Sequence, residues 1–404
     1  MSKTSPAWAG VDGGMHTKLW IAGRTAVVVA SIVGEKVRPS APQTRADIPR
    51  EARDITADWL TDVLCHEHPG ARVTDFRVTG STSETTSRAA IRVGYNKIGA
   101  EAGLPTELYA KTTTGLAQRL LVGGAQVIHG EPLFYTVFRP RIEMEAPLGY
   151  WGGVDNRSWR SMILMEDIAT TRGATFIKPT TPLTRAQVED IVVNLAACHG
   201  AWWEDPELGK LKTTRDHLHN VSGFVDMGKR CAVGLQTARD VVVPAVRDEA
   251  KRLWRGTARA LEMAATQQPP TLLHGDTHVG QAYVTGDGRM GLTDWQSIMA
   301  GGWGYDFGYF VGSACEPDDR REWERELLEL YLTKLGEAGG RPPSFADAWH
   351  IYRQSLCYPC TAWLFAYGRA FYQPRMQPDD TCRTVISRLA TAVDDLGTFD
   401  ALGV

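Results

Sequence analysis

The pattern of hydrophobic and polar residues changes its period near the middle of the chain. In the first half, apolar and polar residues alternate in short runs separated by turn residues, which is typical of strands in an antiparallel sheet. These runs occupy 72–80, 87–96 and 106–114, and an apolar run at 160–169 predicts another strand. The first half therefore predicts a small sheet-rich unit.

Helical spacing of apolar residues predicts most other elements. A helix is expected at 48–64, with Asp54 or Thr56 as its N-cap and one apolar face formed by Ile55, Trp59, Leu60 and Val63. Further helices are predicted at 123–138, 184–203, 240–265, 319–336 and 383–395. Together the patterns predict an α+β protein with two lobes, a small antiparallel-sheet lobe and a larger, mainly helical lobe.

Composition along the chain suggests where these parts begin and end. The polar, proline-bearing residues 35–47 predict a linker, so 1–47 is interpreted as an N-terminal extension and linker. The sheet-rich lobe is expected over 48–170, with a hinge near 166–170. The helical lobe is expected over 171–404.

The apolar run at 19–34 is the one stretch that resembles a membrane segment. It has sixteen residues and contains Arg24, whereas a membrane span needs about 20 apolar residues. A signal peptide would have an uninterrupted apolar region and a small-residue cleavage site. We therefore interpret this run as a strand or a packed extension, with no membrane span.

Bulk composition narrows the class of protein. A chain of 404 residues is long enough for two or three domains, or for one enzyme with two lobes. The net charge of -3 provides no field that would attract nucleic acid or an anionic membrane. Seven scattered cysteines fit a reduced cytoplasm better than a disulfide framework. A redox or metal site at Cys357 and Cys360 is possible, but two buried thiols beside a proline are favoured.

The stretch from 272 to 296 gathers polar residues between apolar flanks. A turn at Gly275 presents Asp276, and a hairpin with its turn at 285–289 returns Asp294 to the neighbourhood of Gln281. Two carboxylates and an amide oxygen then converge, which suits Mg²⁺. A polar hairpin whose acids only cap turns is an alternative. A zinc site at His274 and His278 is a weaker one, because no third ligand is evident.

The segment "HGDTHVGQ" followed by "DWQ" resembles the catalytic loop and metal-binding segment of the aminoglycoside phosphotransferase and choline kinase group. The likeness is greatest to the ecdysteroid-kinase-like branch, also termed CHK kinase-like. The resemblance implies a protein-kinase-like fold and an ATP- and Mg²⁺-dependent kinase that acts on a small molecule. It is specific at 274–296 and loose elsewhere.

The resemblance also implies roles for residues of the helical lobe. Asp276 is the catalytic aspartate that orients, and can deprotonate, the acceptor hydroxyl. Asp294 is the Mg²⁺-binding aspartate, and Gln281 stands where the family has its metal-binding asparagine. Gln281 has the same amide oxygen on a longer stem. His274 is expected to brace the loop, and Asp306 to anchor it.

In the sheet-rich lobe the resemblance implies a nucleotide site. Lys111 is the expected strand lysine, and Glu131 is its candidate partner, with Glu143 and Glu145 as competitors. A hydroxyl-rich turn at Ser81, Thr82 and Ser83 is the candidate phosphate cover. The backbone of Met165, Glu166 and Asp167 is the expected contact for the adenine edge.

The leading hypothesis is therefore a phosphotransferase with an alcohol group as acceptor. Aromatic residues at 348–373 favour an acceptor that is apolar or of mixed polarity. A nucleotide-binding pseudokinase or scaffold is the alternative, because Gln281 replaces the asparagine and the phosphate turn has one glycine. The sequence leaves the identity of the acceptor, the choice of ATP or GTP, and the oligomeric state open.

Overall fold

A computed structural model describes residues 15–37, 41–83, 86–223, 226–370 and 375–404, and it does not describe the side chains of 15–19, 21 and 81–83. The chain forms two compact units. Met1–Arg141 and Pro147–Ala174 belong to the first unit, while Ile142–Ala146 and Thr175–Val404 belong to the second.

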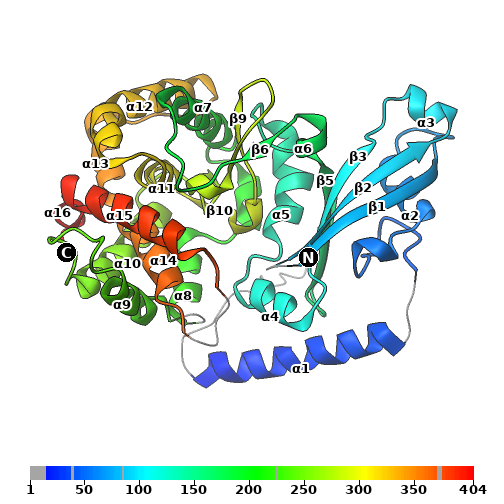
Figure 1. The fold of residues 1–404 in the computed structure, drawn as a ribbon, viewed down its shortest axis with the longest axis horizontal. Coiled ribbons are helices and arrows are strands. Elements are labelled where there is room, and N and C mark those ends of the chain that lie inside the picture. Colours follow the sequence, from blue (N-terminus) through cyan, green and yellow to red (C-terminus); the bar gives the residue numbers. More distant parts are fainter. Residues whose placement is uncertain (1–14, 38–40, 84–85, 224–225, 371–374) are drawn as a thin grey trace. The chain divides into compact units, whose positions relative to one another are not determined.

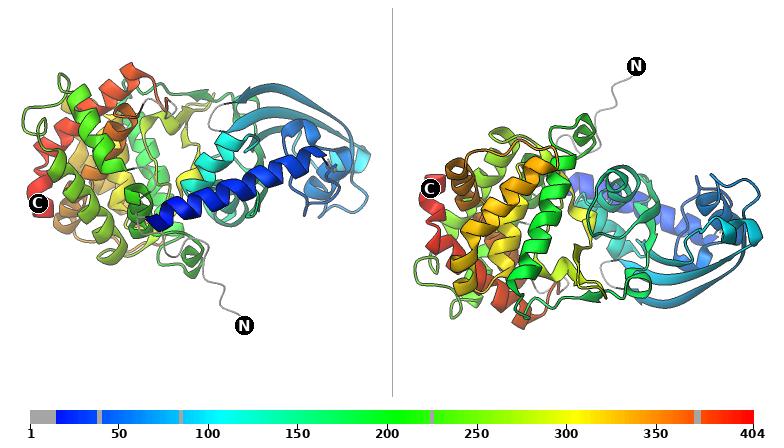
Figure 2. Two further views of the ribbon diagram at one scale, coloured as in Figure 1. Left: turned by 90° about the horizontal axis from the view of Figure 1, so that it is seen from below. Right: turned by 90° about the horizontal axis from the view of Figure 1, so that it is seen from above.

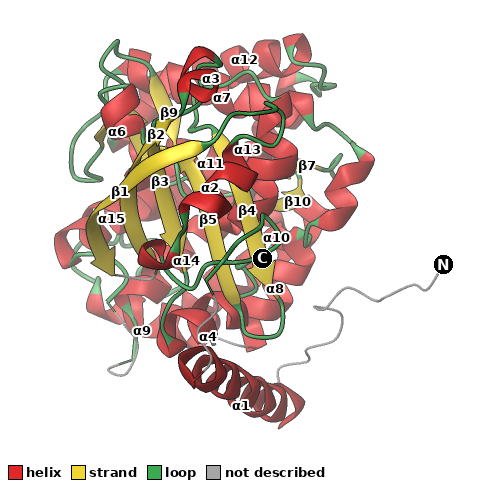
Figure 3. Ribbon diagram, turned by 90° about the vertical axis from the view of Figure 1, so that its right-hand side faces the viewer, coloured by secondary structure: helices red, strands yellow, loops and turns green. Residues whose placement is uncertain are grey.

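A five-stranded antiparallel sheet is the centre of the first unit (Figures 1 and 3). Its strands, in spatial order, are β1 (Val73–Ser83), β2 (Ser87–Tyr95), β3 (Glu107–Thr112), β5 (Arg160–Glu166) and β4 (Gly149–Asp155). The alternating runs predicted β1, β2 and β3, and the apolar run at 160–169 predicted β5. The missed strand, β4, contains Gly149, Gly152 and Gly153, which removes the alternation. Gly152 is needed because a Cβ there would lie 2.8 Å from the backbone of Pro132.

The two faces of this sheet are covered differently. Helix α2 (Ala57–Leu64) begins at its predicted N-cap, Thr56, whose side chain accepts a hydrogen bond from the Trp59 N–H. Trp59 packs in a core with Leu108 and Ala110 of β3. Because side chains alternate along a strand, Lys111 points to the opposite face. That face carries the next helices.

Those helices replace the single helix predicted at 123–138. Helix α4 (Leu116–Gly124) ends early, and α5 (Gly130–Leu133) continues into a π-helical turn, η2 (Phe134–Phe138). Gln126 between α4 and α5 has a φ of 55°, a left-handed conformation that no α-helix contains. The break places α5 against β4 and β5.

The apolar run near the N-terminus forms a helix, α1 (Met15–Val37), so the expectation of a strand was wrong and that of a packed extension was right. Val28 is buried and packs with Val122, Ile128 and Trp159. Helix α1 thus lies along α4 within the first unit (Figure 1). Among the described residues, no helix is long and apolar enough to cross a membrane.

The second unit is mainly helical, and Figure 2 shows its helices grouped around short strands. Helix α7 (Arg185–Ala201) forms within the helix predicted at 184–203, and it begins with a capping box at Thr184 and Gln187. The other helices include α8 (Thr214–Gly223), α9 (Met227–Thr237), α10 (Ala250–Thr266), α11 (Gly304–Ala314), α12 (Pro317–Glu337), α13 (Phe345–Gln354), α14 (Cys357–Tyr367), α15 (Asp379–Asp395) and α16 (Thr398–Leu402). The predicted α+β class is confirmed.

Two small sheets complete the second unit. β7 (Thr271–Leu273) pairs with β10 (Met299–Gly301), and β8 (Ala282–Val284) pairs with β9 (Met290–Leu292) and with β6 (Thr175–Phe176). The β8–β9 hairpin is the one that the turn at 285–289 predicts. The polar stretch from 272 to 296 therefore runs through β7, β8 and β9.

Candidate active site

The loop after β7 is fixed by one buried carboxylate. The His274 N–H donates to Asp306 Oδ2 at 2.6 Å, and the Gly275 N–H donates to Asp306 Oδ1 at 3.0 Å. Asp306 is fully buried in the first turn of α11, and His199 Nε2 lies 3.3 Å from its Oδ2. Gly275 has a φ of 82°, and a Cβ there would lie 2.2 Å from the carbonyl oxygen of Ser297. Asp306 thus anchors the loop.

His274 connects this loop to the segment that leads to Asp294. Its Nδ1 accepts the Asp276 N–H at 3.2 Å, so the imidazole proton is on Nε2, which donates to the carbonyl of Thr293 at 2.9 Å. The ring packs on Trp295, with centroids 4.5 Å apart. His274 therefore braces two segments of backbone.

Asp276 is partly exposed, whereas His274, Gly275 and Asp306 beside it are buried. The Asp276 side chain keeps 32% exposure. The Tyr309 hydroxyl donates to Oδ1 at 3.0 Å, and Gln281 Nε2 donates to Oδ2 at 3.2 Å. Two donors thus fix the plane of the carboxylate, and lone pairs remain for a hydroxyl group from solvent or from a bound molecule.

Gln281 and Asp294 are brought together by the β8–β9 hairpin. The Thr293 N–H donates to the carbonyl of Gln281 at 2.9 Å, which continues the pairing of β9 with β8 up to the residue before Asp294. Asp294 has a φ of 62° and a ψ of 56°. A residue with a side chain adopts this left-handed conformation at a cost, and aspartate tolerates it better than most.

His278 lies beside the same carboxylate. The Gly280 N–H donates to His278 Nδ1 at 3.0 Å, so the proton of the neutral ring is on Nε2, 3.7 Å from Asp276 Oδ2. Burial lowers the pKa of His278, although Asp276 acts in the opposite direction. The neutral ring packs edge-on against Trp363, with centroids 5.1 Å apart.

The first unit contains a second polar pair. Lys111 Nζ lies 2.8 Å from Glu131 Oε2, and the side chains are only 6% and 8% exposed. β3 supplies the lysine and α5 the glutamate, so the structure pairs the two residues that the sequence singled out. Each partner offsets part of the cost of burying the other's charge.

The competing glutamates are placed elsewhere. Glu145 accepts a hydrogen bond from Tyr283 at 2.8 Å and forms an ion pair with Arg289, all within the second unit. Glu143 lines a separate depression with Asp190 and Asn194. Glu143 and Glu145 thus belong to the second unit, whereas Glu131 pairs with Lys111 inside the first.

The residues expected to contact adenine form backbone hydrogen bonds within the first unit. The Glu166 N–H donates to the carbonyl of Leu148 at 2.8 Å, and the Asp167 N–H donates to the carbonyl of Glu107 at 3.2 Å. Met165 pairs with Tyr109 in the sheet. Both N–H groups are thus in use, so any adenine contact here falls to carbonyl oxygens or to other residues.

Two side chains of this segment stabilise its turn. Glu166 accepts from Arg172 Nε at 2.8 Å, and Asp167 caps helix α6 (Ile168–Thr171). Burial alone would raise the pKa of Glu166, but hydrogen bonds from Arg172 and Thr171 hold it below its usual value.

Ser81, Thr82 and Ser83 were expected in a turn, but their backbone lies in β1, paired with Ala89, Arg88 and Ser87. Their side chains lie outside the described part of the chain. Their assignment to phosphate binding stays a prediction.

A comparison with known protein families matches residues 124–349 to a family described as phosphotransferase enzymes. The match covers more than half of the chain and includes Glu131, Asp276, Gln281 and Asp294. The chain belongs to the phosphotransferase enzyme family. The anchored loop, the partly exposed Asp276 and the adjoining Asp294 are therefore parts of a phosphotransferase.

Solved structures similar to this phosphotransferase include a macrolide 2'-phosphotransferase from Brachybacterium faecium, with 13% identity, coverage of 80% of this chain and 96% of that chain, and a TM-score of 0.43. A choline kinase from Streptococcus pneumoniae has 10% identity, coverage of 80% and 94%, and a TM-score of 0.42. An ethanolamine kinase from Plasmodium vivax has 10% identity, coverage of 78% and 81%, and a TM-score of 0.40. At these low scores the membership rests on the family match. No curated protein sequence matches the chain.

The oxygen atoms of the phosphotransferase site fit a magnesium ion. Gln281 Nε2 donates a hydrogen bond to Asp276. The Gln281 amide oxygen lies on the other arm of the same amide group. That oxygen and the Asp294 carboxylate are hard ligands, which Mg²⁺ combines with waters and phosphate oxygens. The described residues contain no group of three or more His, Cys, Asp or Glu side chains placed for a metal. A site with one carboxylate and one amide does not require such a group.

Tyr309 is the site residue that the sequence did not reveal. It lies fifteen positions after Asp294, in the buried helix α11, where an aromatic residue is typical of a core. Burial, together with the negative charge of Asp276, raises its pKa well above the usual value. The phenol is therefore protonated and remains a donor. The spacing of three residues from Asp306, about one helical turn, was the only available signal.

Proposed function

We propose that the protein is an ATP- and Mg²⁺-dependent kinase that transfers the γ-phosphoryl group to a hydroxyl group of a small alcohol. One observation carries the proposal: the Asp276 carboxylate is oriented by Tyr309 and Gln281 while a third of its surface stays open. A purely structural aspartate has no need of that exposure. The finer likeness to the ecdysteroid-kinase-like branch and a cytoplasmic location belong to this proposal.

Asp276 accepts the proton of the acceptor hydroxyl. The acceptor oxygen forms its bond to the γ-phosphorus as the bond from that phosphorus to the β,γ-bridging oxygen breaks, and ADP leaves with the electron pair of that bond. The donors from Tyr309 and Gln281 hold the carboxylate plane so that its free lone pairs meet the hydroxyl. The proton then passes to solvent or to the product phosphate.

The other residues bind and orient the nucleotide. Asp294 and the Gln281 amide oxygen hold Mg²⁺, which when bound neutralises charge on the phosphate oxygens. Lys111 offers its ammonium group to the α- and β-phosphates, and Glu131 keeps that group charged and aimed. We propose backbone contacts of Met165 to Asp167 with the adenine ring, and contacts of Ser81 to Ser83 with the phosphates.

The acceptor is proposed to be a small alcohol of mixed polarity. In the segment 348–373 that first suggested an apolar acceptor, Tyr352, Tyr358 and Trp363 are buried, and Tyr352 donates to Glu324 at 2.9 Å inside the helical unit. Trp363 packs on His278 beside Asp276. Trp363 is thus the aromatic residue of this segment that we propose as an acceptor contact.

A pseudokinase is the second candidate, and Gln281 favours it. The hydrogen bond from Gln281 Nε2 to Asp276 restrains the amide group whose oxygen a metal ion would need. If this bond had to break for metal binding, turnover would be impaired.

Binding and turnover test the proposal separately. Mg·ATP is expected to raise the unfolding temperature, ATP with EDTA to raise it much less, and Lys111→Ala to reduce the Mg·ATP effect. Asp276→Asn is expected to lower kcat for ADP release by about 10²–10⁴-fold, with ATP affinity within a few fold of the parent.

The outcomes distinguish the candidates. Equal shifts with and without EDTA, or no shift at all, would rule out a metal-bridged nucleotide. Loss of ATP binding in Asp276→Asn would make Asp276 a metal ligand instead. Mg·ATP binding without ADP release from any alcohol in a broad panel would favour the pseudokinase.

A further inference from the structure

Helix α8 begins with a capping box that brings two basic side chains together. The Asp216 N–H donates to Thr213 Oγ1 at 3.2 Å, and the Thr213 N–H donates to Asp216 Oδ2 at 2.8 Å. Thr213 is therefore the N-cap, Lys212 precedes it, and His217 is the fourth helical residue. Side chains at these two flanking positions often pack on one another, as two apolar residues do in a hydrophobic staple.

Lys212 and His217 are both buried, with exposures of 7% and 8%. Among the described residues, neither Lys212 Nζ nor His217 Nδ1 has a hydrogen-bond partner. The other nitrogen, His217 Nε2, lies 2.7 Å from the Tyr358 hydroxyl. The protein thus buries two adjacent basic groups and leaves one nitrogen of each unsatisfied.

The neighbouring carboxylate, Asp216, does not satisfy the two unpaired nitrogens. Asp216 raises the pKa of Lys212, but its Oδ2 is taken by the Thr213 N–H and by Thr213 Oγ1 at 2.7 Å. Burial is the larger effect and lowers the pKa of Lys212 to about 8. Burial, with Lys212 next to it, also lowers the pKa of His217. A buried charge without a partner is costly, and an oxyanion that accepted from both nitrogens would remove the cost.

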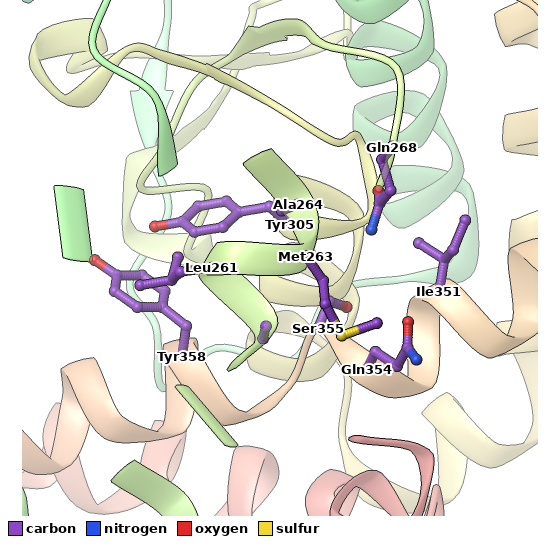
Figure 4. A pocket seen from close by; sticks show the side chains of 10 residues that line it. Leu261, Met263, Ala264, Gln268, Tyr305, Ile351, Gln354, Ser355 and Tyr358 are labelled. Atoms are coloured by element: carbon purple, nitrogen blue, oxygen red, sulfur yellow. The ribbon is translucent and has the colours of Figure 1, made fainter. Parts of the chain in front are cut away.

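The pair lies one aromatic ring away from the catalytic loop. The Tyr358 ring packs on Tyr305 at 5.0 Å and on Tyr309 at 6.3 Å between centroids. The Tyr305 hydroxyl donates to the carbonyl of Gly275 at 3.1 Å. Figure 4 shows Tyr305 and Tyr358 side by side at one end of a small cavity, with their hydroxyl groups directed to the same side. Tyr358 therefore connects His217 with the residues that hold Asp276.

We propose that Lys212 and His217 bind a carboxylate group of the acceptor, so that the substrate is a hydroxy acid. The inference rests on the proposed kinase function, because it assigns the hydroxyl end of the same molecule to Asp276. A carboxylate matches the site, because its two oxygens can accept from the Lys212 ammonium group and from the His217 Nδ1–H. In this arrangement the Tyr358 hydroxyl donates to His217 Nε2. A phosphate dianion would need more donors than these.

Binding is tested first, without any need for turnover. The probes are glycerate, mandelate and 4-hydroxybutyrate, each paired with its primary amide at matched ionic strength. At least one acid is expected to raise the unfolding temperature by about 2 °C or more at saturation, and its amide is not. Lys212→Met should abolish that shift, and Lys212→Arg should keep part of it.

Lys210→Met is the matched control. It removes the same charge two residues away, from an exposed lysine that pairs with Glu207, and it should keep the full shift. His217→Gln is the second variant: its amide can donate to the carboxylate, so the shift should be weakened but not lost. If no acid shifts the parent protein, or if Lys212→Met responds like Lys210→Met, the carboxylate site is refuted.

Turnover then links the site to phosphoryl transfer. For the responding pair, the ratio of kcat/KM for the acid to that for the amide should fall by about 100-fold in Lys212→Met. ADP release with neutral alcohols and no preference for acids would refute the carboxylate site and keep the kinase function. An acid-dependent shift that needs Lys212, without ADP release from any acceptor, would keep the site and refute the kinase function.

Discussion

The single amide group of Gln281 has two proposed partners, Asp276 and a metal ion. Its nitrogen holds Asp276 at 3.2 Å, and its oxygen is the proposed metal ligand. An asparagine at this position has a stem one carbon shorter, so its amide nitrogen reaches Asp276 less easily, while its oxygen can still serve the metal. In the proposed mechanism the longer side chain therefore couples the orientation of the Asp276 carboxylate to metal binding.

This coupling gives a prediction for Gln281. Gln281→Leu removes both contacts, so the Mg²⁺ concentration for half-maximal rate should rise and kcat should fall by about 10–100-fold. Gln281→Asn keeps an amide oxygen and should retain metal binding. The measurement is ADP release against Mg²⁺ concentration at saturating ATP.

The two variants also separate an enzyme from a scaffold. Activity in Gln281→Asn that is absent from the parent would show that the glutamine has silenced the site. An unchanged Mg²⁺ dependence in Gln281→Leu would remove Gln281 from the metal site.

At the scale of elements, helices and strands that have a clear hydrophobic period or local capping and turn residues were predictable. Features that depend on close packing between distant residues were not. Helix α2 begins at Thr56 and the β8–β9 hairpin turns at 285–289, because capping and turn residues act locally. Strand β4 was missed because its glycines interrupt the alternation, and Gly152 is required by the backbone of Pro132, twenty residues earlier in the chain. No local pattern records such a contact.

The residues of the proposed site also divide into those that the sequence predicted and those that only the fold reveals. Lys111 and Glu131 were predictable because a strand lysine and a helix glutamate follow from the resemblance. Tyr309 and the pair formed by Lys212 and His217 were not. An aromatic residue in a buried helix, or a lysine before a helix, has no distinguishing pattern until the fold shows what lies beside it.

Helix α1 supplies a charge that the sheet unit needs. Glu35 pairs with Arg119 at 2.7 Å, and the Arg119 side chain is only 1% exposed. Arg119 belongs to α4 and also donates to the carbonyl of Thr113, just after β3. Glu35 thus ties α1 to the end of the strand that carries Lys111.

Glu35→Gln should therefore destabilise the protein by about 3 kcal/mol, because it leaves the Arg119 guanidinium buried with a neutral partner. Urea unfolding followed by circular dichroism provides the measurement. The control is Glu101→Gln, which breaks an exposed pair with Lys97 and should change the free energy of unfolding by less than about 0.5 kcal/mol. Equal effects of the two substitutions would show that α1 does not contribute a buried charge.

At the scale of the whole molecule, buried histidines connect stability with pH. Burial lowers the pKa of His129 in the first unit and of His217 and His278 in the second. Each is neutral in the folded protein at a pH where the unfolded chain already binds a proton. The unfolded state therefore holds more protons as pH falls, and stability decreases with it.

The free energy of unfolding should consequently be highest above about pH 6.5, the ordinary histidine value, and should fall as the pH is lowered through that value to 5.5. His217→Gln is expected to flatten this slope, because the histidine that faces Lys212 and Tyr358 no longer titrates. His219→Gln, at an exposed position of the same helix, should leave the slope unchanged. The comparison uses urea unfolding at pH 7.5 and 5.5 in buffers without carboxylates, since a bound carboxylate would favour a protonated His217. A slope that His217→Gln does not alter would mean that His217 binds its proton equally well in the folded and unfolded chain, and the cost assigned to the buried basic pair would then fall on Lys212 alone.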